Sequence, residues 1–176
     1  MEPREMKRSF TVVGSLIAFL LQVALAPHIA ILGVVPNLCL GFVVLNAMFC
    51  NSTRASLTGF VLGLLYGLTT QGPLGVMSLV LAVVGYSVSS LNKELFAGSW
   101  RVQALFLLVA AFFGELLYAG FLSILGDEPD FLRSVGMRVV PGTLYDAVFG
   151  LVVFPLIHRF GSGRKKDPNA LKGKFD

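Results

Sequence analysis

The stretch VQALFLLVAAFFGELLYAGFLSIL, residues 102–125, carries a single ionisable acid, Glu115, in 24 residues. A helix of this length is about 36 Å long, which is enough to cross a hydrocarbon layer of about 30 Å. Such a run in a soluble protein would leave much apolar surface to cover. The stretch therefore predicts a membrane-spanning helix.

Five further apolar runs with few charges flank this one. Together the six predict an all-α membrane protein, a six-helix transmembrane bundle over residues 1–160 with a flexible basic tail at 161–176. The runs at 36–50 and 56–70 would be only about 22 Å long as helices, so they either cross with little tilt, extend at their outer ends or form a half-buried hairpin. The predicted spans are 9–26, 36–50, 56–70, 74–91, 102–125 and 141–160.

Composition agrees with this class. Apolar residues make up 55% of the chain, charged residues only 14%, and the mean hydropathy is +0.78, whereas soluble domains are about 25% charged. The net charge of +4 comes from basic residues in short loops and at the termini, which argues against a nucleic-acid-binding face. We expect an integral membrane protein that binds no nucleic acid.

The distribution of lysine and arginine predicts the orientation. Cytoplasmic loops of membrane proteins are enriched in these residues. With six spans, 12 of the 14 basic residues fall on the side of both termini, and only Arg133 and Arg138 fall opposite, in a predicted outer loop at 126–140. Both termini are therefore expected in the cytoplasm.

The first apolar run has a second interpretation. A basic start, an apolar stretch and Ala24-Leu25-Ala26 resemble a cleaved secretory signal. Pro27 follows the candidate cleavage site directly, and the apolar run exceeds the usual signal core of about 7 to 15 residues. A retained helix is the preferred interpretation.

Small residues recur at every fourth position of the third run, at Ala55, Gly59, Gly63 and Gly67. That spacing aligns them on one helix face, where another backbone can approach closely. The pattern predicts helix packing. Spacing alone leaves open whether the neighbour is another helix of this chain, which we favour, or a partner protein.

Glu115 and Asp146 are the two acidic residues expected within the apolar slab. A carboxylate at the centre of a spanning helix costs about 2.5 to 3.5 kcal/mol on insertion scales, so both should face the interior or a partner. A hydrogen-bonded structural role is favoured over a proton relay. Cys39 and Cys50 are expected to be buried free thiols, since neither has a metal-ligand spacing.

The sequence shows no motif for catalysis. HExxH, GxSxG and GxxxxGK are all absent, and His28 and His158 are predicted on opposite sides of the membrane. We therefore predict a protein without catalytic residues, bound metal or cofactor.

Several local patterns resemble the bacterial rod shape-determining MreD family over residues 20–160. They are Leu21-Gln22 before a proline break, the run 33–38 (GVVPNL), the run 59–65 (GFVLGLL), 72–75 (GPLG), Gly85-Tyr86, and 154–156 (FPL). The family often has an acidic residue at the positions of Asn37 and Gly67, where this chain departs from the pattern. The motif at 72–75 adds Pro73 and Gly75 to the candidate helix-packing or partner contacts.

The resemblance implies a non-enzymatic scaffold subunit of the cell-elongation complex. Its partners would be the bitopic scaffold protein MreC, a RodA-type glycosyltransferase and a class B transpeptidase of lateral peptidoglycan synthesis, the MreB filament indirectly, and membrane lipid. The family is also similar in fold to the substrate-binding subunits of energy-coupling vitamin transporters, so the alternative function is substrate capture. Such subunits commonly carry an Ala-x-x-x-Ala seam in the first helix, and this first run contains none.

Overall fold

The structure is a computed structural model that describes residues 8–30, 34–70, 72–95, 100–126 and 130–161, with side chains described for 8–30, 34–70, 72–91, 105–126 and 130–152. Every element in those ranges is helical, in agreement with the predicted all-α class. The elements are α1 (Arg8–Ala24), the 3-10 turn η1 (Ala26–Ile29), α2 (Leu38–Ala47), α3 (Ser52–Thr69), α4 (Val76–Leu95), α5 (Trp100–Ile124), α6 (Phe131–Ser134), the π-helical turn η2 (Val135–Val139) and α7 (Val140–Gly161). The predicted tail from residue 162 onward and most of the acidic loop at 127–130 lie outside the described residues.

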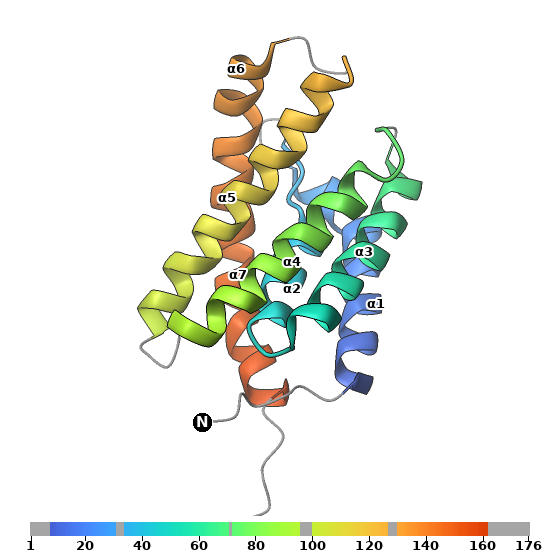
Figure 1. Ribbon diagram of the computed structural model, residues 1–176. Coiled ribbons are helices and arrows are strands. Elements are labelled where there is room, and N and C mark those ends of the chain that lie inside the picture. Colours follow the sequence, from blue (N-terminus) through green and yellow to red (C-terminus); the bar gives the residue numbers. More distant parts are fainter. Residues whose placement is uncertain (1–7, 31–33, 71, 96–99, 127–129, 162–176) are drawn as a thin grey trace, which may run out of the picture.

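The helices form one bundle in which successive segments run in alternating directions (Figure 1). The start of α1 and the end of α7 lie at the same end of the bundle, and the turns that follow α3 and α5 lie at the opposite end. We call this opposite end the distal end. α3 packs along α4, and α5 packs along α7. The order of the segments thus follows the six predicted runs.

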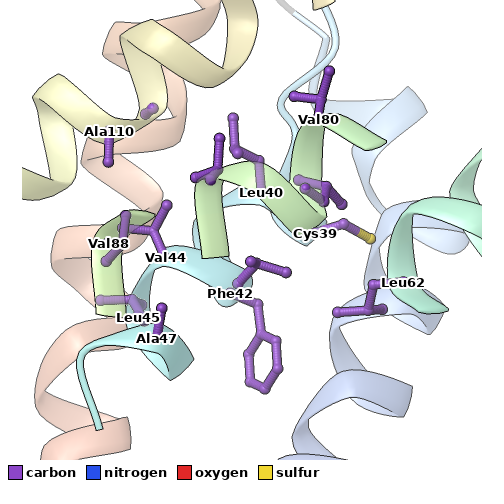
Figure 2. Close-up of a cluster of buried hydrophobic side chains, with 14 of the residues drawn as sticks. Cys39, Leu40, Phe42, Val44, Leu45, Ala47, Leu62, Val80, Val88 and Ala110 are labelled. Atoms are coloured by element: carbon purple, nitrogen blue, oxygen red, sulfur yellow. The ribbon is translucent and has the colours of Figure 1, made fainter. Parts of the chain in front are cut away.

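The short helix α2 occupies the centre of the bundle. All ten of its residues are buried, and it contacts α1, α3, α4, α5 and α7. A helix that is apolar on every side needs neighbours on every side, which explains its central position. Figure 2 shows its side chains packed among those of three other helices, including Leu62 of α3, Val80 and Val88 of α4, and Ala110 of α5.

The second predicted span is shorter as a helix than the sequence suggested. The charge-free run 36–50 predicts about 22 Å of helix, but α2 covers only Leu38–Ala47, or about 15 Å. At its start, Pro36 lacks a backbone N–H and disfavours helix in the residue before it. At its end the chain turns at 48–51, and Asn51 caps α3 by accepting a hydrogen bond from the Arg54 N–H at 3.0 Å. α2 therefore spans about half of a hydrocarbon layer.

The last predicted span is longer than the sequence suggested. Residues 131–140 are helical, so the prediction that Arg133 and Arg138 lie in a loop is wrong. The π-helical turn η2 ends immediately before α7, in which Pro141 is the second residue. A proline ring clashes with the carbonyl four residues earlier in a regular helix, and a widened turn relieves that clash. The helix can thus pass Pro141 without ending.

Among the described residues, two helical stretches are long and apolar enough to cross a membrane, Leu105–Ile124 and Phe131–Val152. Arg8–Ala24, Leu38–Ala47 and Val76–Leu91 are shorter apolar helices. Large apolar side chains also cover the outside of the bundle. On α1 alone, five of them are more than half exposed: Val12, Val13, Leu16, Ile17 and Leu20.

Candidate functional site: a polar cluster at the buried start of α2

α2 begins inside the bundle, where water cannot satisfy its backbone. The first N–H groups of any helix have no partner within the helix, and a buried one left unpaired costs free energy. Leu38, Cys39 and Leu40, the first three residues of α2, are fully buried. Their N–H groups, and that of Asn37, need acceptors from elsewhere in the chain.

Three side chains supply these acceptors. Asp146 Oδ1 on α7 accepts from the Asn37 N–H at 2.6 Å. Gln22 Oε1 on α1 accepts from the Leu38 N–H at 2.6 Å and from the Cys39 N–H at 3.3 Å. The Asn37 side chain accepts from the Leu40 N–H at 3.0 Å. Every N–H at the start of α2 is thereby paired.

Two further hydrogen bonds tie the acceptors together. Gln22 Nε2 donates to the Pro36 carbonyl at 3.0 Å, and Asn37 Nδ2 donates to Glu115 Oε1 on α5 at 3.0 Å. All four polar residues are at most 7% exposed. We call Gln22, Asn37, Glu115 and Asp146 the α2 cap cluster. It joins α1, α5 and α7 to one end of the central helix.

The electrostatics of the α2 cap cluster favour an acid at this position. The N-terminus of a helix carries a partial positive charge from its aligned peptide dipoles, and a carboxylate beside it is stabilising. Asp146 lies at that N-terminus. Its second oxygen, Oδ2, and the Thr143 hydroxyl one turn earlier are buried without a hydrogen-bond partner among the described residues. Asp146 thus caps α2 with one carboxyl oxygen and leaves the other unused.

A cavity of about 340 Å³ adjoins the α2 cap cluster. It is lined by residues of the 34–37 connection, α3, α5, η2 and α7. Its polar lining consists of Asn37, Tyr66, Glu115, Tyr118 and Arg138. The Arg138 guanidinium lies over the Tyr118 ring, 5.2 Å from its centroid. The cavity therefore brings a carboxyl group and a guanidinium to one space.

The predicted small-residue face lies against α4. A Cβ added at Gly59 would collide with the backbone of Leu81, and one added at Gly63 would lie 2.5 Å from the Met77 carbonyl oxygen. Ala55 is fully buried, and its carbonyl oxygen would lie 2.7 Å from a Cβ at Gly85. The neighbour along Ala55 to Gly63 is therefore a helix of the same chain.

The remaining predicted residues lie in or near the turn between α3 and α4. Gly67 faces Gly75, whose backbone nitrogen would be 3.8 Å from an added Cβ. Gly75 has a φ of +93°, a conformation that favours glycine. Pro73 is half-buried. Neither Pro73 nor Gly75 belongs to the α2 cap cluster or lines the cavity.

Glu115 and Asp146 are both buried and converge on Asn37, although the sequence left their separation open. Cys39 and Cys50 are buried thiols that form no disulfide, as predicted. In the part of the chain that the structure describes, no three His, Cys, Asp or Glu residues gather as a metal site.

Among the residues of this region that sequence reasoning missed as functional are Gln22, Asn37, Tyr66 and Arg138. Signals existed for two of them. Gln22 is an amide within an apolar run, and Asn37 follows a proline and precedes an apolar run, which is a helix N-cap pattern. Tyr66 and Arg138 carry no local signal, since they meet only through the fold.

One comparison with known proteins identifies a family. The sequence matches the family described as rod shape-determining protein MreD over residues 4–162. No curated protein and no solved structure matches the chain, so the expected likeness to vitamin-transporter subunits finds no support there. MreD proteins are membrane proteins with a role in determining cell shape. Because the match covers most of its length, this chain belongs to the MreD family.

Proposed function

We propose that this chain is a non-enzymatic, multi-pass scaffold of the bacterial inner membrane with both termini in the cytoplasm. It would bind the bitopic protein MreC and support lateral peptidoglycan synthesis together with a RodA-type glycosyltransferase, a class B transpeptidase and, indirectly, the MreB filament. Membership of the MreD family supports the role in cell shape. The finer assignments rest on the geometry of the bundle.

The observation that carries the proposal is the hydrogen bonding of the two buried acidic side chains. Glu115 and Asp146, which a transport or relay mechanism would need, are both bonded to Asn37 in the α2 cap cluster. A hydrogen bond typically contributes about 0.5 to 1.5 kcal/mol net, so the cluster contributes to holding α1, α5 and α7 around α2. A rigid framework of this kind suits a protein whose task is to hold partners.

The outside of the bundle offers a surface for a spanning partner. The exposed apolar face of α1 runs along Val12, Leu16 and Leu20, which are each more than half exposed. In a membrane such a face meets either lipid or another helix. The small-residue face of α3 is already occupied by α4, so we place the MreC contact elsewhere, with the α1 face as a candidate.

The amide variants Glu115→Gln and Asp146→Asn test the structural role of the acids. Each keeps an oxygen that can accept the hydrogen bond from Asn37, so we expect cells that depend on either variant to stay rod-shaped and MreC to co-purify normally. Glu115→Ala and Asp146→Ala remove the acceptor and should cost about 1 to 3 kcal/mol of stability for each buried donor left unpaired. Co-purification and cell shape are the readouts.

The amide and alanine variants serve as controls for each other. Rounded cells with normally assembled complexes in the amide variants would show that the ionisable proton itself is needed. That result would overturn the scaffold proposal, because a purely structural acid needs only its accepting oxygen.

Substrate capture is the second candidate function, and the cavity favours it. Ligand sites commonly have volumes of about 300 to 1,000 Å³ with a few convergent polar groups. At about 340 Å³, with five polar residues in its lining, this cavity qualifies. Equilibrium dialysis of the purified protein against a panel of water-soluble vitamins separates the two functions, since the scaffold proposal expects no vitamin to bind.

A further inference from the structure

The cavity beside the α2 cap cluster holds groups that the cap does not use. Glu115 gives one oxygen, Oε1, to Asn37. The second oxygen of Glu115, Oε2, takes no part in the hydrogen bonds of the α2 cap cluster. Tyr66 also lines the cavity from α3, and Arg138 lines it from η2. These side chains come from three separate segments and converge on one space.

We propose that this cavity binds a small zwitterion, a molecule that joins a primary ammonium group to a phosphate or carboxylate through a short stem. The ammonium would donate to the unused oxygen of Glu115. The acidic oxygens would accept from Arg138, whose guanidinium carries five N–H donors and can stack on Tyr118 while it donates at its edge. The inference goes beyond the scaffold role and does not depend on MreC binding.

The pairing of charges favours a zwitterion over a simple ion. An anion alone would be attracted by Arg138 but would lie beside the carboxyl group of Glu115, and a cation alone would meet the reverse arrangement. A ligand with both groups complements both charged side chains that line the cavity. Val34, Val35 and Met137 supply an apolar part of the lining that suits a short aliphatic stem.

The size of the cavity favours a small molecule over a protein partner. A volume of about 340 Å³ lies near the lower limit of ligand sites and is too small for a folded segment of another chain. Two sources can supply the same chemistry. One is the phosphoethanolamine headgroup of a membrane lipid, and the other is a free zwitterion such as an amino acid.

Ligand-induced thermal stabilisation of the full chain in detergent tests the proposal. A ligand that binds the folded state alone raises the melting temperature, and the shift grows with the ratio of its free concentration to its Kd. The probes are short-chain phosphatidylethanolamine, O-phosphoethanolamine, L-alanine and, as an anionic lipid without an ammonium group, short-chain phosphatidylglycerol. We expect phosphatidylethanolamine, or a free zwitterion, to raise the melting temperature more than phosphatidylglycerol does.

Three variants test whether the ligand binds in this cavity. Glu115→Gln and Arg138→Gln should each weaken the apparent affinity about tenfold or more, since each removes a charged hydrogen-bond partner of the ligand. Arg133→Gln is the matched control. It removes the same charge five residues earlier on the neighbouring helix α6, where the side chain is exposed and does not line the cavity, and it should respond like the parent protein.

The outcomes divide clearly. Stabilisation by the lipid alone assigns the site to a headgroup, and equal stabilisation by O-phosphoethanolamine or L-alanine assigns it to a free zwitterion. Equal effects of phosphatidylglycerol and phosphatidylethanolamine would overturn the proposal, as would the absence of any shift. If Glu115→Gln or Arg138→Gln fails to fold, native mass spectrometry of the parent protein still decides between the two lipids.

Discussion

Gln22 illustrates at the scale of a single residue how one amide fixes where a neighbouring helix begins. Its oxygen accepts from two N–H groups of α2, and its nitrogen donates to the Pro36 carbonyl. A helix start placed in an apolar interior would otherwise leave these groups without water or partner. The Gln22 side chain therefore allows α2 to begin within the apolar interior.

Replacing Gln22 should be costly for this reason. Gln22→Leu is close in volume but leaves the N–H groups of Leu38 and Cys39 and the carbonyl of Pro36 unpaired. At about 1 to 3 kcal/mol for each buried group, we expect a loss of about 3 kcal/mol or more in unfolding free energy. Unfolding in detergent measures it.

Ser15→Ala is the control on the same helix. It also removes a side-chain hydrogen bond, from Ser15 Oγ to the Thr11 carbonyl at 2.7 Å, but it leaves no N–H group at a helix start unpaired. We expect less than about 1 kcal/mol of change there. If both variants lose the same amount, the capping role assigned to Gln22 is incorrect.

Prediction of the polar cluster from sequence was limited by distance along the chain. Asn37 can be recognised as a helix cap from its neighbours alone. The bond from its N–H to Asp146 joins residues 109 positions apart. No local pattern encodes such a contact, so the sequence indicated that Asp146 needs a partner but not which one.

At the scale of elements, the close packing of α3 against α4 depends on glycines, which have no side chain to separate the two backbones. Gly59 and Gly63 admit the backbone of α4, and Gly85 admits the backbone of α3 in return. Close approach of this kind gains van der Waals contact, which is a main attraction between helices in lipid. The four-residue spacing was visible in the sequence, although its neighbour was not.

Gly63→Leu should separate these two helices. The added carbons would overlap the backbone at Met77 and Ser78, which cannot move aside as a flexible side chain can. We expect a clear fall in melting temperature and reduced yield of folded protein. Overpacking of a tight interface typically costs about 1 to 3 kcal/mol, and more against backbone.

Gly120→Leu provides the matched control. Gly120 also lies within a long helix, α5, but a Cβ built there meets nothing within 4 Å. Its melting temperature should stay close to that of the parent protein. A similar fall in both variants would mean that the loss reflects glycine replacement in general and not the α3 and α4 contact.

The elements themselves were predictable to different degrees. Apolar run length located all six segments because hydropathy depends only on local composition. It overestimated α2, since the charge-free run continues past both ends of the helix. It also placed the last segment too late, because Arg133, Arg138 and Pro141 together resemble a loop, whereas a π-helical turn carries the helix through them.

At the scale of the whole molecule, the alternating directions of the segments bear on topology. The first turn of α3, which contains Arg54, lies toward the end of the bundle where α1 starts and α7 ends. The turns after α3 and α5 lie at the distal end. This arrangement is the one that the partition of basic residues requires if that first end faces the cytoplasm.

Cysteine labelling tests the orientation. Single cysteines at Leu74 and Asp130, both exposed near the distal end, should react in intact cells with an impermeant thiol reagent. One at Thr53 should not react. Thr53 is a better inner reporter than Ser52, whose hydroxyl is hydrogen-bonded to that of Ser90 at 3.0 Å.

The native thiols give a low background in this experiment. Cys39 and Cys50 are both buried, so the parent chain should label weakly. Labelling at Thr53 in sealed cells, with Leu74 and Asp130 silent, would reverse the predicted orientation. Labelling at all three positions would rule out the six-span arrangement.

The bond between Asn37 and Asp146 also sets an order of events during biogenesis. A ribosome delivers α1 and α2 to the membrane long before it has synthesised α7, so the Asn37 N–H must wait for its acceptor over more than a hundred residues of translation. Until then the start of α2 depends on water, lipid headgroups or the insertion machinery. The cap at the start of α2 is thus completed only by the last helix. A chain released before α7 would lack Asp146, which accepts from the Asn37 N–H.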